Sequence, residues 1–293
     1  MQFSLHAITW NVSKFKYAIE FIRQHFQHYT DFIIIGIQES KYNCKHYQNS
    51  IQERFPQYQV VAAQEFTGFN DSYLLSFWLV HQATQDQYNF IKRSGDSIRF
   101  DQVLRNKGAM CIKIGSKTDP SVPPLQFVNA HLHAHEGQVN YQMRVNDLKN
   151  ILTTWSGSVD TILLGDLNFR MQHKTDEFEP QEDGLTEAEQ ELGLMWTFKE
   201  PKINFKPTFK YIPYTSKQSQ KRIASWTDRI MFSEFQYELS EPKDISYNTM
   251  KINYGEFNAN PSDHIPVEFI TDLTVKPHTP LLRSKYTVRV PGL

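Results

Sequence analysis

The chain is poor in cysteine, with only Cys44 and Cys111 among its 293 residues. Two thiols are too few for the disulfide framework of a small secreted domain or for a cysteine-rich zinc site. The sequence also lacks an excess of charge of either sign, because 31 basic residues face 32 acidic ones. Without a global basic field, a protein has no general attraction for nucleic acids or membranes, so any attraction for anions must be local.

Long hydrophobic runs are missing as well. No apolar run approaches the roughly 18–20 residues of a membrane-spanning helix. The runs FIIIGI and YLLSFWLV have the length of strands. The opening MQFSLHAITWNV lacks the basic and the long apolar regions of a signal peptide. We therefore expect a monomeric cytoplasmic protein without a transmembrane segment.

Short apolar segments rich in β-branched and aromatic residues recur along the whole chain. They are LHAITW, FIIIGI, YQVVAA, YLLSFWLV, GAMCIKI, LQFVNAHL, TILLGDLNF, DRIMFS and IPVEFI. Several are apolar on both faces, which is typical of strands covered on both sides. Helical spacing of apolar residues over 15–26 and 148–155, and a capping-box pattern of Thr186 and Glu189, predict helices between them. We predict one α/β domain over residues 1–293, with a large sheet or a pair of sheets flanked by helices.

Polar side chains stand at the ends of several of these apolar segments. The stretch TILLGDLNFR leads from an apolar strand to Asp166 and Asn168, whose side chains would share one face because strand side chains alternate. Comparable residues at other segment ends are Asn11, Glu39, Asn129, His131, His133, His135, Asp228, Asp263 and His264. Each alone has a plain structural explanation, such as a turn. Together they predict a site, because charges beside a buried strand are costly unless paired or bound to a metal.

The residue types in this set indicate a hard cation and a phosphate. Oxygen-rich ligands without thiolates suit Mg²⁺, which keeps several waters and takes only one or two protein carboxylates. Zinc would need more histidine or cysteine ligands, and histidines that alternate along a strand lack the spacing of a helical zinc motif. The chain contains neither a serine-hydrolase elbow nor a nucleotide-binding P-loop.

The order of the motifs resembles that of the inositol polyphosphate 5-phosphatase catalytic domain. The motifs TWNV, QES, NKGA, VNAHLHAHEG, GDLNFR, FKPTFKY, WTDRI and SDHIPV follow one another between residues 9 and 267. GDLN and SDH are shared with a wider superfamily of magnesium-dependent deoxyribonucleases and abasic-site endonucleases, whereas FKPTFKY and WTDRI are more specific. The resemblance implies a deoxyribonuclease-I-like, four-layer α/β sandwich of two mixed β-sheets packed face to face between helices. It also implies an Mg²⁺-dependent hydrolase that removes the 5-phosphate from phosphoinositides such as PI(4,5)P2 and PI(3,4,5)P3, or from soluble inositol polyphosphates.

The resemblance implies roles for the residues near the metal and the attacking water. Glu39 is expected to hold Mg²⁺, with Asn11 close to the metal site. Asp166 is expected to orient and deprotonate the water, and Asn168 to hold that water and a phosphate oxygen. In-line attack of water on a charged phosphomonoester depends on positioning and charge neutralisation, and it needs no covalent phosphoenzyme.

The same resemblance implies roles around the scissile phosphate. His131 is expected to donate to that phosphate. Asp228 is expected to pair with His264, fixing its tautomer and favouring an imidazolium beside the phosphate. Asp263 is expected to support the metal or its waters.

Substrate recognition is assigned by resemblance to basic residues within the motifs. Lys210 and Arg222 match ligands of the substrate's 4-phosphate, and Lys221 is a further candidate. Asn106 and Lys107 match a segment that contacts the 1-phosphate. The partners implied are therefore phosphoinositide headgroups at a membrane surface, visited transiently, or soluble inositol polyphosphates, and no nucleic acid.

The sequence departs from the family pattern at several positions around the site. Phe209 and Phe169 stand where tyrosine is usual, Gln220 where lysine is frequent, Thr227 in place of cysteine and Ile265 in place of lysine. The substitution at Gln220 predicts a weaker 4-phosphate site. Two alternatives remain open, which are a nuclease or abasic-site endonuclease of the same superfamily and a non-catalytic phosphoinositide-binding module. The absence of a basic stripe argues against the first, and the acid, amide and histidine set argues against the second.

Overall fold

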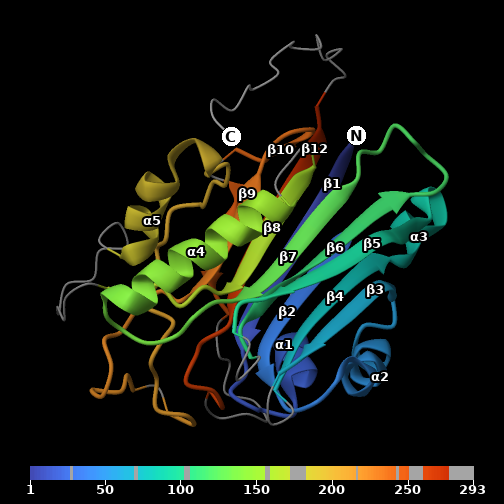
Figure 1. Ribbon diagram of the computed structural model, residues 1–293. Coiled ribbons are helices and arrows are strands. Elements are labelled where there is room, and N and C mark those ends of the chain that lie inside the picture. Colours follow the sequence, from blue (N-terminus) through green and yellow to red (C-terminus); the bar gives the residue numbers. More distant parts are fainter. Residues whose placement is uncertain are drawn as a thin grey trace.

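The chain forms two β-sheets packed face to face, with helices on both outer faces (Figure 1). The computed structural model describes residues 1–26, 29–68, 72–101, 106–155, 159–171, 183–215, 217–241, 244–250 and 260–276. The first sheet has the order β10-β12-β1-β2-β4-β3, with β11 paired to β12, and the second has the order β5-β6-β7-β8-β9. Both sheets are mixed, because β1–β2 and β7–β8 are parallel pairs among antiparallel neighbours. The predicted α/β sandwich of two mixed sheets is therefore confirmed.

The bounds of the strands and helices follow the apolar segments of the sequence. The first sheet contains β1 (Gln2–Asn11), β2 (Phe32–Ser40), β3 (Tyr58–Thr67), β4 (Tyr73–His81), β10 (Tyr237–Leu239), β11 (Ser246–Thr249) and β12 (Val267–Val275). The second contains β5 (Phe90–Arg99), β6 (Gly108–Ser116), β7 (Leu125–His131), β8 (Asp160–Asp166) and β9 (Asp228–Ser233). The helices are α1 (Ala18–His25), α2 (Cys44–Arg54), α3 (Gln82–Tyr88), α4 (Gln138–Trp155), α5 (Gly184–Leu192) and the short 3₁₀ helix η3 (Gly193–Met195).

Three layers of buried apolar side chains hold the sandwich together. Between the sheets, Ile34 and Trp78 of the first sheet pack in one cluster with Phe127 and Leu164 of the second. Helices α1 and α2 cover the outer face of the first sheet, and α4 and α5 cover the outer face of the second. Figure 1 shows α4 lying across β7 and β8. Burying one such large apolar side chain contributes about 1.5–3 kcal/mol, which explains why strands apolar on both faces occupy the middle of each sheet.

The fold differs from the sequence-based expectations in several places. Helix α4 begins at Gln138, ten residues before the apolar spacing over 148–155, and two further differences have a clear local cause. Strand β5 has few apolar residues and is mostly exposed, so its sequence carries no buried-strand pattern. Helix α5 begins at Gly184, because the Asp183 carboxylate caps it by accepting hydrogen bonds from the backbone N–H groups of Leu185 and Thr186. The expected N-cap at Thr186 is therefore wrong by three residues, because Asp183 caps the helix before the capping-box pattern begins. In the part of the chain described, no helix is long and apolar enough to span a membrane.

The strand directions bring the polar segment ends to one edge of the sandwich. The parallel pair β1–β2 ends at Asn11 and Ser40, and the parallel pair β7–β8 ends at His131 and Asp166. Strand β9 runs the other way, so its first residue, Asp228, stands opposite Asp166. Residues from both sheets thus meet at this edge, as the carboxyl ends of parallel strands do in other α/β folds.

Candidate functional site

Asp166 lies at the centre of the polar cluster and is almost fully buried. Its Oδ2 accepts a hydrogen bond from Asn11 Nδ2 at 3.0 Å and lies 3.4 Å from His131 Nε2. Burial would raise the pKa of this carboxyl, but the positive field of His264, His131 and Lys107 outweighs burial and holds the pKa well below its usual range. The preceding Gly165 is required because a Cβ there would stand 1.9 Å from the carbonyl oxygen of Ala130 on the neighbouring strand.

Asn168 reaches the same pocket as Asp166 by a route that strand alternation does not describe. Strand β8 ends at Asp166, and Asn168 adopts a left-handed backbone conformation with φ of 56°. Its backbone N–H donates to Asp166 Oδ1 at 3.1 Å, which closes a tight turn. Its Nδ2 donates to the carbonyl oxygen of Leu132 at 3.1 Å. The expected juxtaposition of the two side chains is present, but a turn produces it and a continued strand does not.

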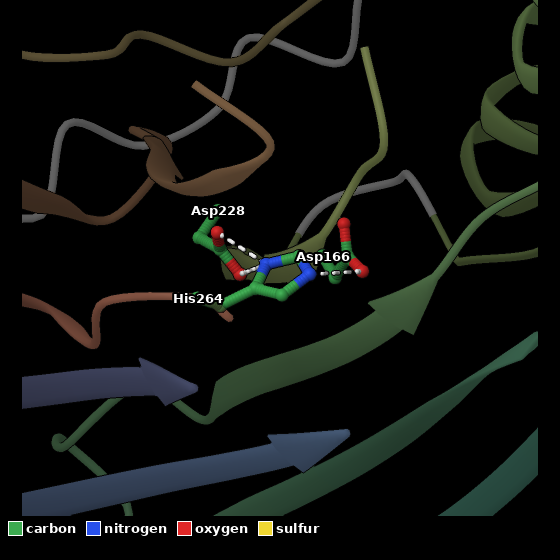
Figure 2. Close-up of side chains that lie close together, drawn as sticks. All are labelled: Asp166, Asp228 and His264. Atoms are coloured by element: carbon green, nitrogen blue, oxygen red, sulfur yellow. Dashed lines mark hydrogen bonds and ion pairs between the residues drawn. The ribbon is translucent and has the colours of Figure 1, made fainter. Parts of the chain in front are cut away.

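His264 and Asp228 form a buried pair beside Asp166 (Figure 2). His264 Nδ1 lies 2.9 Å from Asp228 Oδ2, and its Nε2 lies 3.9 Å from Asp166 Oδ2. The same Asp228 oxygen accepts hydrogen bonds from the hydroxyls of Thr208 at 2.6 Å and Thr227 at 2.9 Å. Burial alone would lower the pKa of His264, but the two carboxylates more than offset it and raise the pKa to about 9. The ring is therefore an imidazolium at neutral pH.

These three groups lie close enough to bind a metal ion as well. The hydrogen-bond geometry argues against it, because Asp228 already accepts from two hydroxyls and from His264 Nδ1. An imidazolium has no lone pair to offer a cation. The trio fits the holding and donation of a proton.

Glu39 is the carboxylate whose position fits a cation best. It is the penultimate residue of β2 and lies in the left-handed region with φ of 55°, which few glutamates adopt, and strain of this kind gathers at functional sites. Its side chain is one-third exposed and lines the pocket, and its Oε1 lies 3.6 Å from His131 Nε2. Asn11 is less suited than Glu39 to bind a cation. Its Oδ1 accepts a hydrogen bond from the backbone N–H of Ser13 and its Nδ2 donates one to Asp166, so both ends of its amide are engaged.

Lys107 is buried against His131 and Asp166. Its Nζ is hydrogen-bonded to His131 Nε2, and only 7% of its surface is exposed. Burial lowers the pKa of the Lys107 ammonium, and the nearby carboxylates of Asp166 and Glu39 act in the opposite direction. The residue expected to contact a 1-phosphate thus lies beside the reacting centre, while its neighbour Asn106 is absent from the pocket lining.

Only two of the three residues expected to bind the 4-phosphate line the pocket. Lys210 and Arg222 line the pocket, whereas Lys221 is exposed and does not. Lys210 Nζ donates to Asp263 Oδ2 at 2.8 Å, and this bond helps to lower the pKa of Asp263 although burial would raise it. Arg222 is largely exposed at the pocket mouth.

Asn11, His131 and Asp228 do not line the pocket themselves but lie against Asp166 or His264, which do, whereas Asn129 and His133 make their contacts elsewhere. Asn129 is buried between the sheets, where its amide donates to the carbonyl oxygen of Leu75 and accepts from Gln38. His133 pairs with Asp147 of α4 at 2.7 Å. The hydrogen bonds of Asn129 and His133 therefore connect the layers of the fold. His135, in contrast, lines the pocket and has a left-handed backbone conformation with φ of 77°.

Arg170 is a pocket residue that the sequence analysis missed. It is 9% exposed, and its Nη2 donates to Asn168 Oδ1 at 2.6 Å. The signal was available, because Arg170 closes the GDLNFR motif that supplied Asp166 and Asn168. The pocket it helps to line has a volume of about 240 Å³. The pocket lining combines the carboxylates of Glu39, Asp166 and Asp263 with the cations of Lys107, Arg170, Lys210 and Arg222.

Comparisons with known proteins agree with this architecture. Residues 8–270 match the model of endonuclease/exonuclease/phosphatase family 2. The polyphosphatidylinositol phosphatase INP53 of Saccharomyces cerevisiae is 25% identical over 279 residues, which cover 81% of this chain and 23% of that protein. The chain thus spans about a quarter of that relative's length.

Two solved structures show how widely the fold is used. The inositol polyphosphate 5-phosphatase domain of SPsynaptojanin, in complex with inositol (1,4)-bisphosphate and calcium ion, aligns with a TM-score of 0.70 and 17% identity over 94% of this chain and 86% of that one. The ferrous NO complex of Cimex nitrophorin aligns with a TM-score of 0.68 and 17% identity over 94% and 99%. Likeness at this level shows the fold alone, and chemistry must be argued from the site. The family match over residues 8–270 shows more, and the chain belongs to endonuclease/exonuclease/phosphatase family 2.

Proposed function

We propose that the chain is the catalytic domain of a metal-dependent phosphatase that removes the 5-phosphate from phosphoinositides or soluble inositol polyphosphates. The observation that carries this proposal is the pocket in which an ionised Asp166 stands among Lys107, His131 and the His264 imidazolium. A pocket that only binds an anion needs cations, and a buried carboxylate would repel the ligand. The names of the yeast relative and of the SPsynaptojanin domain support the same substrate class.

Asp166 is suited to hold and deprotonate the attacking water. Asn11 Nδ2 fixes its Oδ2 and the Asn168 backbone fixes its Oδ1, so the carboxylate cannot turn away from the pocket. A base held in one orientation lets the water attack in line with the leaving oxygen. Asn168 lines the pocket and gives one N–H to Leu132 and one oxygen lone pair to Arg170, so its second N–H and second lone pair are the groups suited to hold a phosphate oxygen and the water.

The cations of the pocket are suited to neutralise the phosphate in the transition state. His264 presents Nε2 on the side of Asp166, since Asp228 occupies its Nδ1. An imidazolium fixed in this way donates to a phosphate oxygen without reorganisation. Lys107 adds an ammonium donor beside the same position, and His131 would donate there from Nε2 when that nitrogen carries a proton and is released from Lys107.

Glu39, supported by Asp263, would hold Mg²⁺. The oxygen donors suit a hard cation, and Asn11 acts through Asp166 because both ends of its own amide are engaged. When bound, the cation supplies Lewis-acid stabilisation of charge on the phosphate.

Arg222 and Lys210 would read the phosphate next to the scissile one. Arg222 at the mouth has a planar guanidinium suited to a bidentate phosphate contact. Lys210 must exchange its bond to Asp263 for the substrate, so its contribution to binding is the difference between two ion pairs. Lys221 and Asn106, outside the pocket lining, would contact only the periphery of the headgroup.

The pocket mouth also fits a membrane surface. Ile212 and Tyr214 are 45% and 68% exposed on a loop whose backbone is bound to Asp263 and Asn260. Val139 is 69% exposed at the start of α4, close in sequence to the pocket residue Glu136. Apolar side chains on segments that adjoin the pocket residues Glu136 and Asp263 would contact the bilayer while a lipid headgroup enters the pocket.

A panel of substrates tests the proposal. Phosphate release is measured from PI(4,5)P2, PI(3,4,5)P3, a soluble inositol trisphosphate and abasic DNA, with Mg²⁺ and with EDTA, and the lipid product is identified by its remaining phosphates. We expect PI(4)P from PI(4,5)P2 with Mg²⁺ only, and no such product from Asp166→Asn. Cleavage of the DNA without phosphate release from any inositol substrate would instead assign a phosphodiesterase.

A vesicle assay tests the membrane contact separately. Co-sedimentation with PI(4,5)P2-containing vesicles should fall for Ile212→Ser with Tyr214→Ser. Phe235→Ser is the matched control, because Phe235 is 42% exposed but follows β9 at the end away from Asp228. An equal fall for both would contradict a membrane contact at the mouth.

A further inference from the structure

Arg170 touches the catalytic cluster on two sides. Its Nη2 donates to Asn168 Oδ1 at 2.6 Å, and its guanidinium carbon lies 4.1 Å from the centre of the Phe209 ring. The Phe209 ring in turn packs against the His264 ring with centres 4.7 Å apart. Arg170 thereby connects, through one side chain, the turn after β8 with the histidine that precedes β12.

The contact with Asn168 fixes which way the amide faces. A guanidinium only donates hydrogen bonds, so Arg170 selects the amide oxygen, and the carbonyl of Leu132 only accepts, so it selects the amide nitrogen. A flipped amide would place N–H against N–H on one side and oxygen against oxygen on the other. Without Arg170, only the bond to Leu132 would hold the amide.

The contact with Phe209 fixes the position of the guanidinium and of the ring. A cation over an aromatic face is attracted by the ring's negative π surface, and the attraction strengthens when water is excluded, as it is for Arg170. The Phe209 ring therefore contacts both the Arg170 guanidinium and the His264 ring. Because Phe209 has no hydroxyl, the face of its ring is the part of the side chain that contacts the guanidinium.

We infer that Arg170 is a positioning residue, which locks the Asn168 amide in one orientation and supports His264 through Phe209. This inference deepens the proposed function and rests on it for its kinetic consequence. Arg170 also lines the pocket, but the positioning effect passes through Asn168 and Phe209 and does not depend on contact with the substrate. Its orientation of Asn168, in contrast, is a property of the free protein and can be observed without turnover.

The kinetic test compares Arg170→Met, Arg170→Lys and Asn168→Ala on PI(4,5)P2. Displacement of a catalytic group by about 1 Å can cost on the order of 100-fold in rate, so Arg170→Met should lower kcat about 10- to 100-fold and change KM less than about 3-fold. Arg170→Lys should fall between wild type and Arg170→Met, since an ammonium can reach Asn168 but lacks the planar fork. Arg170→Met should slow Asn168→Ala by a clearly smaller factor than it slows the wild type, because the Asn168 route is already lost and only the support of His264 through Phe209 remains to be removed.

Arg23→Met is the matched control. Arg23 also packs over a phenylalanine, Phe55, at 5.7 Å and donates to a backbone carbonyl, that of Arg54. These residues precede β3, whose first residue pairs with the last residue of β4, so they lie at the end of the sheet away from Glu39. Arg23→Met should keep wild-type kcat, and full additivity of Arg170→Met with Asn168→Ala would overturn the inference.

An NMR measurement tests the inference even if the proposed function fails. The side-chain amide signal of Asn168, identified by its loss in Asn168→Ala, should shift and exchange faster with solvent in Arg170→Met but not in Arg23→Met. An unchanged Asn168 amide in folded Arg170→Met would overturn the inference, whatever reaction the wild type catalyses. Conversely, a wild type inactive on every inositol substrate, with the amide changed as expected, would refute the function and leave the positioning role standing.

Discussion

Replacing Asp228 by asparagine should move the alkaline limit of activity. Asp228 is buried, and its carboxylate lies 2.9 Å from His264 Nδ1. The rise of the His264 pKa from 6.5 to about 9, against the opposing effect of burial, corresponds to about 3 kcal/mol at about 1.4 kcal/mol per tenfold change in proton binding. Asparagine keeps the shape and removes the charge that contributes most to this rise.

The size of the effect follows from the protonation of one ring. At pH 7.5, a histidine with a pKa of about 9 is almost fully protonated, whereas one with a pKa of about 6.5 or below is protonated in about a tenth of molecules or fewer. Asp228→Asn should therefore lower kcat/KM about 10-fold or more at pH 7.5, and by a smaller factor at pH 6. Because the folded pKa lies above the unfolded one, the pair stabilises the fold fully below about pH 6.5 and loses this effect as pH rises through about 9.

The assay is a profile of kcat/KM against pH with Mg²⁺ held constant, together with thermal unfolding at each pH. Thr208→Val is the matched control, since it removes a hydroxyl donor from the same Asp228 oxygen and leaves the charge. Its alkaline limb should stay in place or move to higher pH, because the carboxylate becomes a stronger acceptor for His264. A wild-type profile with no decline near pH 9, or the same limb in wild type and Asp228→Asn, would refute the assignment of His264 as the imidazolium donor.

Four further outcomes are expected. Exhaustive EDTA treatment should abolish turnover and added Mg²⁺ should restore it; activity that survives chelation would contradict a cation at Glu39. Asp166→Ala should cost at least about 10²-fold in kcat with circular dichroism unchanged. Cys44→Ala with Cys111→Ala should keep kcat within a few-fold, because burial raises the pKa of both thiols to about 12 and keeps them unreactive. Arg222→Ala should lower kcat/KM about 10-fold for PI(4,5)P2, but not for a 5-phosphorylated lipid without the 4-phosphate; equal losses would mean that Arg222 does not read that phosphate.

The layered fold could be predicted because the inner strands are apolar on both faces. Segments such as FIIIGI and TILLGD carry that pattern over their whole length, and they became β2 and β8 in the two sheets. Strand β5 could not be predicted in this way, because it lies at the edge of the second sheet and most of its side chains are exposed. Its strand conformation comes from pairing with β6, which is a tertiary effect that local composition does not record.

The residue types of the pocket were visible in the sequence, but their contacts were not. Lys210 was expected to face a phosphate, and in the structure its ammonium is bound to Asp263, which another motif supplies. Lys107 was expected at a distant phosphate and is buried against His131. Such pairings join segments that lie far apart in the sequence, so no spacing along the chain encodes them.

Strand alternation correctly predicted that Asp166 and Asn168 lie together, although Asn168 lies beyond the end of the strand and a turn brings it there. Glu39, Asn168 and His135 line the pocket, and all three have positive φ, a region that costs side chains other than glycine of order 1 kcal/mol or more. A strand that continued past Asp166 would carry Asn168 away from Arg170 and Leu132, so the left-handed turn is what places its amide between them. The turn at Asn168 persists because its backbone N–H is bonded to Asp166 and its side-chain amide to Arg170 and Leu132. Binding and catalysis at this edge therefore depend on a local arrangement that helix and strand propensities disfavour, which is why the strands could be predicted from the sequence and the turn geometry that completes the pocket could not.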